Sequence, residues 1–151
     1  MRDTDGYLAG GDQPLNRDEL RLAAQSKLED AKILFAHKRT SSAYYLCGYA
    51  VELALKACIV QQIISETLPD KALVRSVYSH DFPTLVGLAG LSLELKSKLE
   101  ADPASSASWA IVREWLPDAR YRAYTHTEAQ TLIEAVEHPE SGVLKWITRF
   151  W

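Results

Sequence analysis

The sequence has few of the residues that tight turns require. Its 151 residues include 7 Gly and 6 Pro, too few to punctuate the many turns of an all-β sandwich. Hydrophobic residues make up 47% and charged residues 25%, which places the chain outside the disordered and fibrous classes. Its length favours one domain with a single core. We therefore expect a single helical domain.

The chain also lacks an excess of positive charge. Its formal net charge is -3 at pH 7, which excludes a surface coated in basic residues for indiscriminate nucleic-acid binding. This net charge is still compatible with a local cluster of basic residues that binds nucleic acid. Composition alone names no activity, so any functional inference must come from short motifs and from resemblance.

Cysteine is scarce. Cys47 and Cys58 fall in one predicted helix, where eleven residues at a rise of ~1.5 Å place their Cα atoms about 16 Å apart, too far for a disulfide. We expect free thiols and a cytoplasmic location. The chain has no Cys-x-x-Cys motif and no His/Cys cluster with zinc-ligand spacing, so we expect no metal and no cofactor.

The first residues lack the apolar core of a secretory signal. They mix charge, Gly and Pro, so we expect a flexible lead-in over residues 1–15 and one domain over residues 16–151.

One hydrophobic run, from Ala43 to Val60, is long enough to raise the question of a membrane span. Glu52 and Lys56 lie within it, and each opposes insertion by roughly 2.5–3.5 kcal/mol. We therefore reject a span and expect no membrane association. A helix that is apolar almost all round is the central member of a bundle, and Glu52 and Lys56 form a favourable i,i+4 pair on it.

Helical signals cover the rest of the chain. Asn16 and Glu19 have the spacing of a capping box, and Ser41-Ser42 can cap the central helix, so the first two helices should form an antiparallel hairpin. Shorter helices are expected to begin near Asp81, Ser92, Ser105 and Thr125 and after Pro139. The sequence predicts an all-α, up-and-down helical bundle of two long and several shorter helices.

Three stretches carry a family resemblance. They are the Ala-Tyr-Tyr-Leu-Cys-Gly-Tyr-Ala-Val-Glu-Leu-Ala-Leu-Lys-Ala string that ends at Ala57, the His80-Asp81 pair before a short helix, and Trp115 shortly before Arg120-Tyr121. Together they resemble the HEPN family (higher eukaryotes and prokaryotes nucleotide-binding domains). The resemblance implies a helical bundle that is commonly dimeric. It also implies two alternative functions: metal-independent ribonucleases of toxin and defence systems, and non-catalytic domains that accompany nucleotidyltransferases.

The ribonuclease members resemble one another in an Arg-x(4–6)-His motif, and Arg120 and His126 have this spacing with five residues between them. A histidine has the pKa needed to move the proton of a 2′-hydroxyl or leaving group without a metal. Arg120, helped by Arg122, would hold the scissile phosphate. We take Arg120 and His126 as the candidate catalytic pair and Arg122 as a candidate RNA-binding residue.

Two features weigh against cleavage. Tyr121, beside Arg120, stands where the family's ribonucleases carry a small polar residue or His. The same spacing also recurs between Arg75 and His80, outside the family position. Both alternatives therefore stay open: a ribonuclease, or a non-catalytic nucleotide-binding module that works with a nucleotidyltransferase or antitoxin partner.

The core helix contains one carboxylate, Glu52, which needs a cationic partner if buried. We expect Arg120 to be that partner. Glu52 and Tyr121 would then contact Arg120 and orient it without touching the ligand. The last helix has apolar residues on two faces and is followed by Trp151, which predicts a homodimer that covers the second face.

Overall fold

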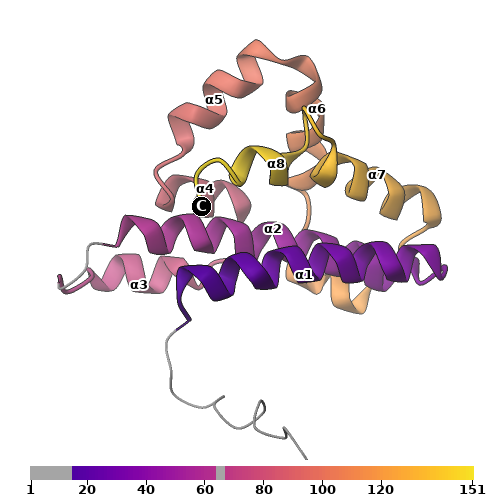
Figure 1. The fold of residues 1–151 in the computed structure, drawn as a ribbon, viewed down its shortest axis with the longest axis horizontal. Coiled ribbons are helices and arrows are strands. Elements are labelled where there is room, and N and C mark those ends of the chain that lie inside the picture. The colour runs from indigo at the N-terminus through magenta and orange to yellow at the C-terminus, as the bar shows by residue number, and fades with distance from the viewer. Residues whose placement is uncertain (1–14, 64–66) are drawn as a thin grey trace, which may run out of the picture.

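The fold is an all-α bundle, as predicted, and is seen in a computed structural model that describes residues 15–63 and 67–151 (Figure 1). Apart from Leu15, the expected lead-in over residues 1–15 lies outside the described residues. Within the described ranges the elements are α1 (Arg17–Ala36), α2 (Thr40–Gln62), α3 (Lys71–Val77), α4 (Phe82–Leu88), α5 (Ser92–Ala101), α6 (Pro103–Val112), the 3-10 helix η1 (Pro117–Tyr121), α7 (His126–Glu137) and α8 (Val143–Ile147).

Helices α1 and α2 form the predicted antiparallel hairpin, and they lie side by side along the molecule (Figure 1). The capping box at the start of α1 is confirmed, because the Asn16 Oδ1 accepts from the Glu19 N–H at 2.9 Å and Glu19 accepts from the Asn16 N–H at 3.0 Å. The turn between the helices is tight and passes through Lys38, whose φ of 62° is in the left-handed region.

The expected Ser41-Ser42 cap of α2 is wrong. Helix α2 begins at Thr40, and Arg39, its N-cap residue, makes no side-chain capping bond. The Ser41 hydroxyl instead accepts the Tyr124 N–H at 2.8 Å. A tertiary partner therefore takes the oxygen that a local cap would use.

Helix α2 is the core of the bundle. It contacts α1, α4, η1, α7 and α8, and it is buried on almost every side. By length and composition it is apolar enough to cross a membrane, but 67% of its most apolar window is buried inside the protein. That burial is typical of the core helix of a soluble domain, as the sequence predicts.

Trp115 packs directly on α2. The predicted helix from Ser105 to Leu116 instead runs from Pro103 to Val112, because Asp102 caps it two residues early by accepting from the Ala104 N–H at 3.1 Å. Trp115 follows in the turn, is 1% exposed, and lies against Gly48 of α2 where a Cβ would overlap its ring. Only a glycine at this position lets the ring approach so closely.

Two aromatic rings complete the packing of Trp115. Phe82, at the start of α4, stacks on it with centroids 5.4 Å apart, and the ring of Tyr45 of α2 lies 6.0 Å away, tilted by 24°. Trp115 therefore joins α2, α4 and the chain that leads into η1.

The last helix differs from the expectation of a free second face. The four apolar residues of α8 are all buried within the chain: Val143, Leu144, Trp146 and Ile147. Trp151 is half-buried, and the Arg21 guanidinium lies 5.4 Å above its ring. Both faces of α8 are thus covered without a partner.

Replacing Gly48 with alanine should destabilise the fold by about 1–3 kcal/mol, because the new methyl group must displace the Trp115 ring. Urea unfolding followed by circular dichroism measures this change. Gly87→Ala is the matched control, since its Cβ would meet only Ser92 Oγ at 3.7 Å and alanine favours a helix by up to ~1 kcal/mol. A Gly48→Ala protein as stable as the Gly87→Ala protein would contradict this packing.

Candidate phosphate-binding site

Two hydrogen bonds fix the end of the bundle where α2 begins. The Thr40 hydroxyl donates to the Tyr124 carbonyl at 2.7 Å, and the Tyr124 N–H donates to the Ser41 hydroxyl at 2.8 Å. The ring of Tyr124 also stacks on Tyr44 with centroids 3.6 Å apart. The segment between η1 and α7 is therefore held against the first turn of α2.

A small pocket opens beside these bonds. We call it the basic pocket; its volume is about 90 Å³, and it is lined by Ser41, Ser42, Tyr45, Ala119, Arg120 and Arg122. A second hollow of about 240 Å³ adjoins it at the two serines and is lined by residues 38–42, which include Lys38 and Arg39. Four basic side chains thus surround the start of α2.

Most of this positive charge is uncompensated. Arg120 is exposed, and no carboxylate in the described part of the chain pairs with it. Its guanidinium lies 4.7 Å above the ring of Tyr121, so Tyr121 does contact Arg120 as expected. Arg122 bonds to Asp118 through Nε at 3.0 Å and Nη2 at 2.9 Å, and these bonds raise the pKa of Arg122.

His126 lies at the same end of the bundle but does not line the basic pocket. It is the first residue of α7 and is exposed, with its ring 4.6 Å from the ring of Phe35 at the end of α1. The capping box that positions it is confirmed, since the Thr125 hydroxyl accepts from the Glu128 N–H at 3.2 Å. The structure therefore brings Arg120 and Arg122 together and leaves His126 outside.

Other ionisable groups near the core are held in their neutral forms. Burial, with a smaller contribution from Tyr124, raises the pKa of Tyr44 to about 12, so its phenol keeps its proton at neutral pH. Burial likewise raises the pKa of the Cys47 thiol and raises that of Cys58 to about 11. Neither cysteine is therefore an activated nucleophile. Both are free, as predicted.

Glu52 is buried, as expected, but its expected partner is wrong. Its Oε1 lies 2.5 Å from the Nδ1 of His80, and its Oε2 lies 3.4 Å from the Nζ of Lys56. Arg120 does not reach Glu52. It lines a pocket beside Tyr45, which lies seven residues, or about 10 Å along the helix, nearer the start of α2 than Glu52 does. The position of His80 directly before the N-cap of α4 was a usable signal, since that turn packs on α2.

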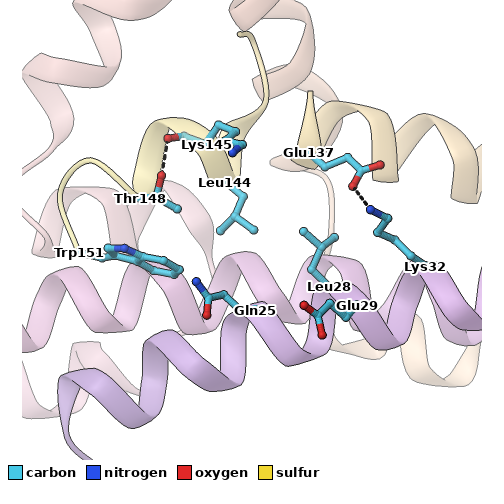
Figure 2. A pocket seen from close by; sticks show the side chains of 9 residues that line it. All are labelled: Gln25, Leu28, Glu29, Lys32, Glu137, Leu144, Lys145, Thr148 and Trp151. Atoms are coloured by element: carbon cyan, nitrogen blue, oxygen red, sulfur yellow. Dashed lines mark hydrogen bonds and ion pairs between the residues drawn. The ribbon is translucent and has the colours of Figure 1, made fainter. Parts of the chain in front are cut away.

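A larger hollow of about 460 Å³ lies between α1 and the α7–α8 region (Figure 2). Leu28 and Leu144 form its apolar floor, and Lys32 pairs with Glu137 at 2.9 Å along one side. Its charges are of both signs, so it lacks the excess positive charge of the basic pocket. In the described ranges, no group of three His, Cys, Asp or Glu residues is arranged to hold a metal ion.

A double-mutant cycle tests the partner of Glu52. Glu52→Gln and His80→Ala should show a coupling free energy of about 1–3 kcal/mol in urea unfolding, because each substitution alters one partner of the same hydrogen bond. The same cycle with Arg120→Ala should be additive within about 0.5 kcal/mol. Coupling to Arg120 instead of His80 would contradict the observed pair.

The comparisons with known proteins agree with the fold. The model of the HEPN domain family matches residues 18–138, which is most of the chain. No curated protein matches, and no solved structure matches. The matched range includes α2 with Glu52, the His80 turn, η1 with Arg120, and α7. The chain belongs to the HEPN domain family.

Proposed function

We propose that this HEPN domain binds a ribonucleotide phosphate in the basic pocket and acts as a binding module, in the cytoplasm, with a nucleotidyltransferase partner. The observation that carries the proposal is the placement of Arg120, an exposed guanidinium with no carboxylate partner in the described chain, beside the uncapped start of α2.

The chemistry of the basic pocket matches a phosphate. A guanidinium can donate two parallel hydrogen bonds to phosphate oxygens, and Ser42 adds an exposed hydroxyl. The first N–H groups of α2 have no side-chain cap, and the positive end of a 23-residue helix favours an anion. Lys38 and Arg39 in the adjoining hollow add long-range attraction.

RNA cleavage is the second candidate function, and the exposure of His126 at the same end of the bundle favours it. In this mechanism His126 takes the proton of a 2′-hydroxyl, whose oxygen attacks the adjacent phosphorus. The P–O5′ bond breaks and the 5′-oxygen takes up a proton, which leaves a 2′,3′-cyclic phosphate and a 5′-hydroxyl. Arg120 would stabilise the charge on the phosphate oxygens. His126 does not line the basic pocket that contains Arg120, so this mechanism requires a phosphate that reaches beyond that pocket.

Arg120→Ala should weaken binding of a fluorescently labelled adenosine nucleotide by roughly tenfold to a hundredfold, since it removes a charged hydrogen-bond donor worth ~1.5–3 kcal/mol. Fluorescence anisotropy at fixed ionic strength measures the affinity. Arg149→Ala is the matched control, because Arg149 is exposed at the end of the chain, away from the basic pocket. Equal affinities of the two variants would exclude the pocket.

Cleavage is tested with mixed RNA in the presence of EDTA. If His126 acts as proposed, the wild-type chain forms 2′,3′-cyclic phosphate ends without a metal, and His126→Ala loses at least about a hundredfold in rate. The helical signal in circular dichroism should not change, because His126 is exposed. An active His126→Ala protein, or products formed only with a divalent cation, would exclude this mechanism.

We also propose that the chain forms a homodimer, for which α1 offers an exposed face that bears two large apolar side chains. Leu22 and Ile33 are 66% and 58% exposed, and their spacing of eleven residues places them on the same side of the helix. A twofold interface buries such a face on both copies. Light scattering should give twice the chain mass at tens of micromolar, and Ile33→Glu should give a monomer. A monomeric wild-type protein would exclude the dimer.

A further inference from the structure

The hollow between α1 and the α7–α8 region takes no part in the functions proposed above, and we call it the α1–α8 hollow (Figure 2). Its volume of about 460 Å³ lies within the range of pockets that hold small molecules, roughly 300–1,000 Å³. Its lining residues come from α1, from the end of α7, and from α8 and the residues that follow it. Segments far apart in the sequence therefore build one concave surface.

The floor and one end of this hollow are apolar. Leu144 is buried and Leu28 is half-buried, and their side chains point toward each other between α8 and α1 (Figure 2). The half-buried ring of Trp151 lies at one end, beside Gln25. The Arg21 guanidinium lies 5.4 Å from the centroid of this ring and restrains it. An aliphatic chain that enters the hollow would therefore leave water and contact a prepared apolar surface.

Two of the four charged side chains that line the hollow neutralise each other. The Lys32 Nζ lies 2.9 Å from a carboxylate oxygen of Glu137, so this pair links α1 to α7. Glu29 precedes Lys32 by three residues on α1, a spacing at which opposite charges often pair, but Lys32 binds α7 instead. The exposed carboxylate of Glu29 is left with no ion pair or hydrogen bond within the described chain.

Lys145 is an unpaired cation on the opposite wall. The positions three and four residues away from it carry no carboxylate, and the Thr148 hydroxyl bonds only to its backbone carbonyl, at 2.7 Å. The exposed ammonium group has no partner in the part of the chain that the structure describes. Figure 2 shows Glu29 on the α1 side and Lys145 on the α8 side, with Leu28 and Leu144 between them. Unpaired charges of opposite sign thus flank an apolar surface.

This arrangement matches a zwitterion whose two charges are far apart. An α-amino acid carries its ammonium and carboxylate on one carbon atom, so it cannot place them on opposite walls, whereas an ω-amino acid has an aliphatic chain between them. We propose that the α1–α8 hollow binds a small ω-amino acid, with its carboxylate at Lys145, its ammonium at Glu29, and its methylene groups on the apolar floor between them. The site requires neither the basic pocket nor a phosphate, so it goes beyond the proposed function and is independent of it.

Three small molecules of the same chain length separate the contributions of the two charges: 6-aminohexanoate, hexanoate and hexylamine. The indole N–H signal of Trp151 in nitrogen-15 NMR spectra of the full chain reports occupancy, and Trp151→Phe assigns this signal. At pH 7 and fixed ionic strength, 6-aminohexanoate should shift it with a dissociation constant on the order of 0.1–1 mM, as expected for a ligand of this size. Hexanoate and hexylamine each lack one charge and should bind about threefold to tenfold more weakly.

Matched substitutions assign each charge of the ligand to one wall. Glu29→Gln should weaken binding of 6-aminohexanoate about threefold to tenfold and should not weaken binding of hexanoate, which has no ammonium group. Lys145→Gln should weaken binding of 6-aminohexanoate by a similar factor and should not weaken binding of hexylamine. Glu94 and Lys71 are exposed outside the hollow, so Glu94→Gln and Lys71→Gln are controls that should leave each affinity unchanged. Thermal unfolding of the variants shows whether a lost affinity follows from lost structure.

The outcomes decide the proposal. Binding of 6-aminohexanoate that is weakened by the two substitutions in the hollow, and by neither control, supports the site. Equal affinity of the wild-type chain for 6-aminohexanoate and hexanoate would overturn it, because Glu29 would then contribute nothing. An equal loss in Glu29→Gln and Glu94→Gln would also overturn it, since net charge alone would explain the binding. A Trp151 signal that stays in place up to about 20 mM 6-aminohexanoate, far above the expected dissociation constant, would exclude the site.

Discussion

The contact between Trp115 and Gly48 sets the position of everything that follows it in the chain. Since no Cβ stands between them, the indole packs directly against the backbone of α2, and the chain enters η1 at a fixed distance from that helix. Phe82 stacks on the same ring, which fixes the start of α4 and the turn that carries His80. Arg120 and His80 are far apart in sequence, yet both are placed by this one indole.

The buried carboxylate of Glu52 is costly for a fold of this size. Removing a carboxylate from water carries a penalty of several kcal/mol, and hydrogen bonds to His80 and Lys56 offset it without making the pair a strong source of stability. A leucine at this position would give the core helix a continuous apolar surface. Glu52 therefore fixes the orientation of the His80 ring without adding much to the stability of the bundle.

Local patterns in the sequence predict what local chemistry determines. The caps at Asn16, Asp81 and Thr125 are confirmed because each capping bond spans three residues. The same reasoning fails at Ser41, whose hydroxyl is taken by Tyr124, 83 residues away. At Glu52 it succeeds for the i,i+4 partner Lys56 but misses His80, which is 28 residues distant. A carboxylate in an apolar helix indicates that a cationic side chain lies nearby. Which cationic residue pairs with it depends on the tertiary packing.

The Arg120 and His126 spacing illustrates the same limit at the candidate site. A motif of this kind fixes separation along the chain, whereas the chain here turns through η1 and is held by Tyr124 before α7 begins. Arg120 consequently lies in the basic pocket and His126 beside Phe35. The sequence predicts that both residues lie at one end of the bundle. Their relative orientation depends on the hydrogen bonds that hold Tyr124 against the start of α2.

Those bonds from Thr40 and Ser41 to Tyr124 also have a consequence for biosynthesis. The hairpin of α1 and α2 is complete in sequence once Gln62 has been made, but one wall of the basic pocket is supplied by Ala119, Arg120 and Arg122. Chains emerge from the ribosome from the N-terminus onward, so a growing chain exposes the apolar α2 long before Arg120 and Arg122 have been made. The basic pocket is thus completed only after synthesis has passed η1.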